Sequence, residues 1–281
     1  AWRIISEGME RLLGRTPDLS AADPPSKSRL LDTHELGPVL TVNEDGSSPF
    51  LLFGDHAGNL IPRRLSTLGL SAENRARHIA WDNGVMGVGE RLSVQLDAVF
   101  VAQRYSRLVI DCNRDPLSAD AVPISSDGTV ISGNEELSDE ELTARIAAIH
   151  APYHARIADH IAARTQAGRP TILVALHSFT PTMGGASRPW QIGILHWRGR
   201  TDFARALIAG LVGDGRFLVG DNEPYRMDAT DYSVPHHAFR ANLPYAEIEV
   251  RQDLISELTG QETWSRILAT QLQNAAHAIG L

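Results

Sequence analysis

Stretches of apolar residues alternate with polar segments rich in Gly and Pro, and the spacing within each stretch predicts its secondary structure. The clearest stretch is TILVALHSF, residues 171–179. It is β-branched and aliphatic and contains polar residues near its end, which is typical of a strand buried on both faces. Similar patterns predict strands at residues 48–54, 98–105, 107–114, 191–197, 217–222 and 245–253.

Apolar residues at helical spacing predict the elements between these strands. A long helix is expected to begin after Ser138, to kink at Pro152 and to end near Gly168. Other helices are predicted at residues 2–14, 201–213 and 260–279, with one or two more within 71–96. Strands that alternate with helices predict an α/β fold, a three-layer sandwich in which helices flank a central mixed, mostly parallel sheet.

The domain organisation follows from a change in composition near the N-terminus. Residues 15–29, RTPDLSAADPPSKSR, are rich in Pro, Ser and Asp and are expected to be extended. We therefore expect residues 1–35 to form an N-terminal helix and an extended lead-in, and residues 36–281 to form a single α/β domain. A chain of 281 residues can bury one large core.

Charge and cysteine content narrow the classes of partner and compartment. The formal net charge is −8 and no Lys/Arg-rich run occurs, which argues against nucleic acid and anionic membranes as partners. The single cysteine, Cys112, excludes an intramolecular disulfide and fits a reducing compartment. We read neither a transmembrane stretch nor a signal peptide, so a cytoplasmic location is expected. A homo-oligomer is compatible with the sequence.

Polar residues stand at the ends of four predicted strands. They are Asp55 and His56, Asn113 and Arg114, His177 and Ser178, and Glu247 and Glu249. Ligands of open α/β sheets bind at the carboxyl ends of the strands. These side chains are therefore expected to form one polar pocket.

Two of these residues, His56 and His177, are candidate metal ligands. Each is followed by small residues that leave the imidazole accessible, although a histidine at a strand end can also be purely structural. A catalytic Zn²⁺ site also takes carboxylate ligands, so the third ligand is expected to be an acid. Asp82 is the first candidate and Asp55 its competitor. Asp82 could instead cap the following helix.

Glu249 is the expected general base, because a carboxylate can take the proton of a metal-activated water and pass it to a leaving amine. Glu247 lies on the same face of the predicted strand, so spacing alone does not separate the two. The structural alternative for these carboxylates is a buried ion pair with Arg251.

Three arginines lie near the ends of the predicted strand 107–114. Arg104 and Arg107 flank its start, and Arg114 is at its end. A guanidinium binds a carboxylate through two parallel hydrogen bonds, so an arginine here would hold an acidic substrate. Arg114, beside Asn113, is the first candidate, although each arginine could instead form an internal salt bridge.

Residues 221–240 form a long predicted loop, and loops of this length in compact domains are usually functional. Tyr232 and His237 in this loop are expected to contact the acyl group or to donate to an oxyanion. The alternative is ordinary packing of both side chains. Ser178, beside His177, is also grouped with the substrate-binding residues.

Taken together and in order, seven motifs resemble the N-formylglutamate amidohydrolase family, which is related to zinc-dependent carboxypeptidases and aspartoacylase-like deacylases. They are GDHAGNLIP, AWDNGVMGVGERLS, RYSRLVIDCNRDP, PYHARIADHI, ALHSFTP, VGDNEPY and LPYAEIEVRQDLI. The resemblance implies a phosphorylase/hydrolase-like fold, as in zinc exopeptidases. It also implies hydrolysis of a small-molecule N-acyl amino acid with a bound Zn²⁺ or another divalent metal.

The resemblance also implies roles for individual residues. His56 and His177 would bind the metal, Asn113 and Arg114 would bind a substrate carboxylate, and Glu249 in EVRQD would be the catalytic acid-base group. The carboxypeptidase-like relatives have His-x-x-Glu, whereas this chain has Asn59 at the position of that Glu. We therefore expect Asp82 to replace it.

Three alternatives stay open at this point. The protein could be an exopeptidase, a deacylase of another substrate, or a ligand-binding protein that retains the pocket without turnover.

Overall fold

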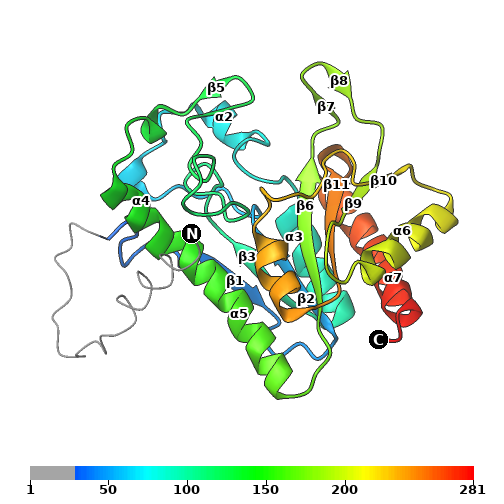
Figure 1. Cartoon of the computed structure of the whole chain (residues 1–281). Helices are drawn as coiled ribbons and strands as arrows, with labels where there is room; N and C mark the ends of the chain where they lie inside the picture. The colour runs from blue at the N-terminus through cyan, green and yellow to red at the C-terminus, as the bar shows by residue number, and fades with distance from the viewer. Residues whose placement is uncertain (1–28) are drawn as a thin grey trace, which may run out of the picture.

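The computed structural model describes residues 29–281, and a seven-stranded mixed sheet lies at its centre (Figure 1). The strand order is β1-β3-β2-β6-β11-β9-β10. The pairs β1–β3 and β9–β11 are antiparallel and the other pairs are parallel, which confirms the predicted mixed, mostly parallel sheet. The strands are β1 (Val39–Val42), β2 (Phe50–Gly54), β3 (Val99–Gln103), β6 (Ile172–Phe179), β9 (Ile192–Leu195), β10 (Val219–Asp221) and β11 (Tyr245–Arg251).

Helices cover both faces of this sheet, as a three-layer sandwich requires. Helices α3, α6 and α7 pack on one face, where Leu92, Phe203 and Leu268 belong to one apolar core. Helix α5 packs on the other face through Tyr153 and Ile157, which belong to a second core (Figure 1). The bounds are Val85–Leu96 for α3, Ala151–Gln166 for α5, Asp202–Asp214 for α6 and Leu258–Ala278 for α7.

Side chains alternate between the two faces of each strand, and this alternation determines which polar side chains share the α5 face of the sheet. In β6, Val174 and Leu176 point into the core beneath α3, α6 and α7, whereas Leu173 and Ala175 point into the core beneath α5. Because successive strand side chains alternate, His177 continues the α5 face. By the same alternation, Tyr245 at the start of β11 places Glu247 and Glu249 on that face.

The predicted strand at residues 107–114 is wrong. This segment consists of turns, in which the amide of Asp111 donates to the carbonyl of Ala121 at 2.7 Å. The Asp111 side chain in turn accepts from the amide of Asn113 at 2.8 Å. Residues 108–110 are buried, so the apolar run reflects core packing and not a hydrogen-bonded ladder.

The predicted long helix is present but has three parts. A capping box joins Ser138 and Glu141 at the start of α4 (Asp139–Arg145). A π-helical turn, η3 (Ile146–His150), separates α4 from α5, in which Pro152 is the second residue. Proline has no N–H for the regular ladder, which accounts for the irregular turn at the predicted kink. The helix ends before Gly168, which has φ +64°.

Several small elements escaped prediction because they are too short to show a period. They are the hairpins β4–β5 (Ser125–Ser126, Thr129–Val130) and β7–β8 (Thr182–Met183, Ala186–Ser187), the π-helical η4 (Pro235–Phe239), the 3-10 turns η1 (Arg63–Leu65), η2 (Ser132–Asn134) and η5 (Gln252–Leu254), and the edge strand β1. The segment 71–96 contains two helices, the short α2 (Ala72–Ala76) and α3. The predicted helix at 2–14 lies outside the described residues, and the division at residue 35 stays a prediction.

Candidate metal centre and active site

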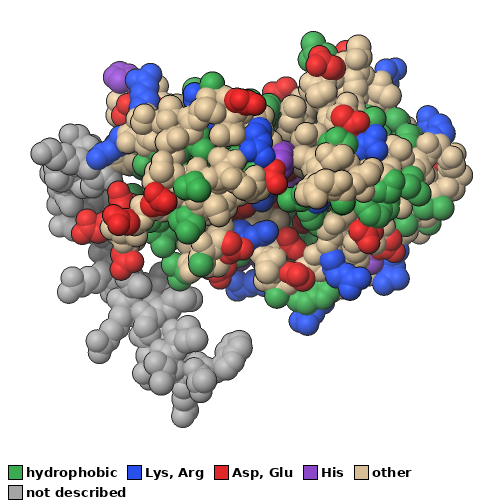
Figure 2. Space-filling model, turned by 90° about the horizontal axis from the view of Figure 1, so that it is seen from above, with side chains coloured by type: hydrophobic (Ala, Val, Ile, Leu, Met, Phe, Trp, Pro, Cys, Tyr) green, Lys and Arg blue, Asp and Glu red, His purple; other side chains and the backbone are tan. Residues whose placement is uncertain are grey.

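A cavity of about 650 Å³ lies where β2, β6 and β11 end. Its lining includes His56 after β2, His177 in β6 and Glu249 in β11. Figure 2 shows this side of the molecule, where a histidine and charged side chains are visible in the hollow between two parts of the surface. The carboxyl ends of the parallel strands therefore gather the polar residues, as expected for an open α/β sheet.

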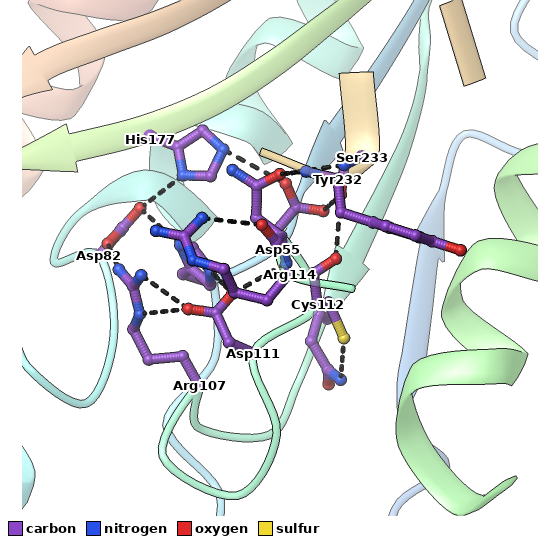
Figure 3. Close-up of polar contacts among 12 residues, drawn as sticks. Asp55, Asp82, Arg107, Asp111, Cys112, Arg114, His177, Tyr232 and Ser233 are labelled. Carbon is purple, nitrogen blue, oxygen red and sulfur yellow. Dashed lines mark hydrogen bonds and ion pairs between the residues drawn. The ribbon is translucent and has the colours of Figure 1, made fainter. Parts of the chain in front are cut away.

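His56, Asp82 and His177 form a compact buried group. One nitrogen or oxygen atom of each lies within 4.8 Å of those of the other two. Asp82 Oδ2 is 2.9 Å from His177 Nδ1 and 3.4 Å from His56 Nδ1 (Figure 3). The amide of Asp82 donates to the carbonyl of His56 at 2.9 Å, which holds the loop before α3 against the end of β2.

The other ring nitrogen of each histidine faces a second carboxylate. His56 Nε2 lies 2.6 Å from Asp111 Oδ1, and His177 Nε2 lies 3.3 Å from Asp55 Oδ2. Histidines that bind metals commonly place their second nitrogen against a carboxylate in this way, which fixes the tautomer and the ring orientation. The Nδ1 atoms are then left to face Asp82.

The group fits a divalent cation. His56 Nδ1 is buried and has no hydrogen-bond partner among the described residues, which is costly unless another ligand satisfies it. Ligand atoms of a tetrahedral Zn²⁺ lie roughly 3.3 Å apart, close to the two Asp82–imidazole separations. Two imidazoles and one carboxylate also match the ligand chemistry of a catalytic Zn²⁺ with an open position.

The ionisation of these side chains is mutually dependent. Burial alone would raise the pKa of Asp55, but hydrogen bonding and the charge of His177 lower it to about 2. Against the same opposing effect of burial, His56 and His177 lower the pKa of Asp82. The carboxylates raise the pKa of both histidines, although burial opposes this. An acid-rich group of this kind suits a bound cation.

Glu249 and Glu247 lie beside this group on the α5 face of β11. Glu249 pairs in register with His177 of β6, and both glutamates are buried in the cavity wall. Burial raises the pKa of Glu249 to about 7 and raises that of Glu247 as well. The Oε2 atom of each has no hydrogen-bond partner among the described residues. A carboxyl group near neutrality can both accept and return a proton.

The sequence model of the N-formylglutamate amidohydrolase family matches residues 48–256. The chain belongs to this family. The match spans every element that contributes to the site, from β2 to β11, and it confirms the resemblance seen in the sequence. Membership supports an amidohydrolase, a hydrolase of amide bonds.

Two solved structures show the same fold as this family member. The crystal structure of gene product Atu2144 from Agrobacterium tumefaciens is 37% identical, covers 90% of this chain and 100% of its own, and superposes with a TM-score of 0.87. An N-formylglutamate amidohydrolase from Ralstonia eutropha JMP134 is 19% identical, covers 86% of this chain and 98% of its own, and has a TM-score of 0.62. None of the curated proteins matches significantly. Among residues 29–281 no helix has the length and apolarity needed to cross a membrane.

In this family member, neither alternative to Asp82 belongs to the compact group. Asn59 points elsewhere, because its Nδ2 donates to the carbonyl of Arg75 at 2.6 Å. Asp55 stands behind His177 and accepts from the hydroxyl of Ser233 at 2.7 Å. Although Asp55 is adjacent to His56 in the chain, its side chain reaches His177. Asp55 therefore orients His177.

Arg107 lines the cavity, but its charge is already paired. Its Nε and Nη2 donate to Asp111 Oδ2 at 3.1 and 2.7 Å, and its Nη1 lies 3.7 Å from Asp82 Oδ1. The guanidinium thus holds the carboxylate that holds His56. The Nε and Nη2 donors of Arg107 are therefore occupied by Asp111, and a contact between Arg107 and the substrate stays a prediction.

Asn113 and Arg114 also line the cavity, and both hold the segment 230–233 in place. Asn113 Oδ1 accepts from the amides of Tyr232 and Ser233, each at 3.0 Å. Arg114 pairs with Asp120 at 3.0 Å and donates to the carbonyls of Asn113 at 2.8 Å and Thr230 at 3.4 Å. These polar groups are therefore occupied by the protein itself.

Three further predicted substrate contacts lie outside the cavity lining. Arg104 donates to the carbonyl of Gly37 at 3.3 Å, toward the edge strand β1. His237 Nε2 lies 3.0 Å from His154 Nδ1 of α5, because η4 turns its side chain into the core. The Tyr232 ring stacks on His236 with centroids 4.8 Å apart and points away from Asp82 and His177 (Figure 3).

Ser178 does line the cavity, although its hydroxyl is occupied. It donates to the carbonyl of Asn83 at 3.1 Å, and its amide lies 3.3 Å from Asp82 Oδ2. Ser178 therefore holds Asp82 in place as well as facing the cavity.

Asp111, Tyr225 and Arg226 were missed by the sequence reasoning although all three line the cavity. Asp111 lay within a segment predicted to be a strand, where alternation did not single it out. Tyr225 and Arg226 lie in the long loop before η4, whose length was the only available signal.

Proposed function

We propose that this protein is a metal-dependent amidohydrolase that cleaves the amide bond of an N-acyl amino acid, releasing a small carboxylic acid and a free amino acid. One observation carries the proposal. A buried His56–Asp82–His177 group, with Asp111 and Asp55 behind its imidazoles, lies beside Glu249 in one cavity. Family membership supplies the class of bond.

His56, Asp82 and His177 would hold Zn²⁺ or another divalent cation. When bound there, such a cation polarises the amide carbonyl and makes a water molecule more acidic. Neighbouring groups of the protein orient the three residues that would bind the cation. Asp111 and Asp55 hold the two imidazoles, and the Asp82 amide is bonded to the carbonyl of His56.

Glu249 is the proposed acid-base group. Its raised pKa, about 7, suits a carboxylate that removes a proton from the attacking water and then transfers it to the departing amine nitrogen. Its place opposite His177 in the β6–β11 register puts it beside the group that would bind the cation. Glu247, two residues earlier, faces the same cavity, so each needs its own test.

The test is a panel of N-formyl, N-acetyl and N-succinyl amino acids incubated with the zinc-loaded protein, with unblocked dipeptides as a second panel. We expect release of the free amino acid from at least one N-acyl compound. Turnover of dipeptides alone would identify an exopeptidase and contradict the proposed substrate class. Zinc binding without turnover of either panel would favour a ligand-binding protein.

A further inference from the structure

Some arginines at the cavity are paired with acidic side chains and others are not. Arg107 and Arg114 are paired with Asp111 and Asp120, at 2.7 and 3.0 Å. By contrast, Arg226 lines the cavity and Arg188 contacts its lining, and neither has a carboxylate within 4.0 Å among residues 29–281. The positive charge available to a ligand therefore lies on arginines that the sequence did not single out.

Arg188 is held in place entirely by neutral groups. Its Nη1 donates to the Tyr225 hydroxyl at 2.9 Å and to Thr180 Oγ1 at 3.3 Å, and its Nη2 contacts Met183 Sδ. Its guanidinium carbon lies 4.7 Å from the centroid of the Tyr225 ring. Tyr225, Thr180 and Met183 all line the cavity, so Arg188, which directly follows β8 (Ala186–Ser187), lies behind these lining residues.

Tyr225 contacts Arg188 and also lines the cavity that contains the metal-binding group. Its hydroxyl accepts from Arg188, and the cavity lining includes Tyr225 together with His56, Asp82, His177 and Glu249. Arg226 follows Tyr225 in the chain and lines the same cavity. Arg226 and the three residues that hold Arg188 therefore line the same cavity as the His56–Asp82–His177 group and Glu249.

A half-buried guanidinium without an acid is unusual, because its charge loses solvation and gains no ion pair. Arg188 still has donors to offer, since arginine carries five N–H groups in a planar fork. Such a fork binds carboxylates through two parallel hydrogen bonds. A substrate with an amide at the metal and a carboxylate elsewhere in the cavity would match both the metal-binding group and these arginines.

We infer that Arg188, held by Tyr225 and assisted by Arg226, binds a carboxylate of the amino-acid portion of the substrate. The inference rests on the proposed function for the position of the scissile amide. Selectivity for a carboxylate would then depend on Arg188, directly after β8, and on the segment Tyr225–Arg226. Arg107 and Arg114 are instead positioning residues that hold Asp111 and the segment 230–233.

The test compares N-formyl-L-glutamate with its two monoamides, N-formyl-L-glutamine and the α-carboxamide, in wild type, Arg188→Gln and Arg226→Gln. Arg188→Lys keeps the charge without the fork. The matched control is Arg198→Gln, since Arg198 also lies over an aromatic ring, that of Trp197, but lines no part of the cavity. KM and kcat are measured separately for each substrate.

We expect the wild type to prefer the diacid over one of the monoamides by about tenfold to a hundredfold, the worth of hydrogen bonds to a charged group. Arg188→Gln should remove most of this preference through KM, Arg226→Gln should reduce it, Arg188→Lys should restore part of it, and Arg198→Gln should leave it unchanged. A merely structural Arg188 would lower thermal stability without changing the preference. An unchanged preference in both Gln variants would overturn the inference while hydrolysis itself stood.

If the wild type hydrolyses none of the three compounds, calorimetric binding of N-formyl-L-glutamate to the zinc-loaded proteins separates the two proposals. Binding that weakens in Arg188→Gln but not in Arg198→Gln supports the arginine site, although the proposed hydrolysis fails. Binding that is absent from the wild type, or equal in all variants, overturns the arginine site.

Discussion

Asp111 Oδ1 lies 2.6 Å from His56 Nε2, and the other oxygen of the same carboxylate accepts two hydrogen bonds from Arg107. The imidazole is thereby fixed with Nδ1 toward Asp82. An Arg–Asp–His chain of this kind controls the affinity of a histidine for a metal without touching the metal.

We therefore predict that Asp111→Asn lowers zinc affinity by about tenfold to a hundredfold while the protein stays folded. Competition with a chromophoric chelator measures the affinity. The matched control is Asp221→Asn, because the exposed Asp221 holds His196 at 2.8 Å in the same type of pair outside the site. Equal zinc affinity in wild type and Asp111→Asn would refute the orienting role.

Glu249→Gln should retain the metal and reduce kcat by about a hundredfold to ten-thousandfold, because the amide cannot carry the proton. Glu247→Gln is the comparison, since it removes a neighbouring carboxylate from the same strand face. Zinc content and kcat are measured on the same samples. A larger loss in Glu247→Gln than in Glu249→Gln would reverse the assignment of the two residues.

Asn113→Ala should destabilise the fold, because it leaves the amides of Tyr232 and Ser233 without their acceptor. An unpaired buried donor costs about 1–3 kcal/mol. Urea unfolding of the metal-free protein measures the loss. Asn274→Ala, on the exposed side of α7, serves as the control. A loss no larger than that of the control would mean that solvent replaces the acceptor at both amides.

Two buried histidines, His154 in α5 and His237 packed against it, should make the protein less stable in acid. Burial, together with neighbouring His150 for His154 and His236 for His237, lowers the pKa of His154 and His237 to about 3, while Asp55 opposes this shift at both. Below the ordinary value of 6.5, the unfolded chain binds a proton that the folded chain does not, so stability falls as pH falls from about 6.5 toward 3.

His237→Gln should therefore lose less stability than the wild type between pH 7 and pH 5, by about 1–2 kcal/mol. Chemical unfolding at the two pH values in metal-free protein gives the comparison, because His56 and His177 contribute equally to both proteins. A parallel decline in wild type and variant would show that His237 is protonated in the folded state.

The sequence predicted the sheet and the strand-end histidines because both follow from local patterns. The period-two burial of β6 fixed the face of His177, and the same period placed Glu247 and Glu249 together on β11. Asp82 could be predicted as the third metal ligand because a catalytic Zn²⁺ site with two histidines also needs an acidic ligand. These predictions needed only the direction of each strand.

The partners of the arginines could not be predicted in the same way. Pairing of Arg107 with Asp111 depends on the turns at 107–114, which the apolar run disguised as a strand. The positions of Tyr232 and His237 depend on η4, whose single irregular turn packs them against α5 and not into the cavity. Such contacts depend on the path of the loops, which residue periodicity does not encode.

Hydrolysis by this protein should require a divalent metal held by His56, Asp82 and His177. The most direct measurement titrates Zn²⁺ into chelator-stripped protein and records bound metal and amide hydrolysis in the same samples, with His177→Ala alongside. We predict no hydrolysis without metal, a rise that ends at about one equivalent, and neither binding nor activity in His177→Ala. Full hydrolysis by the stripped protein, or by His177→Ala, would contradict the claim.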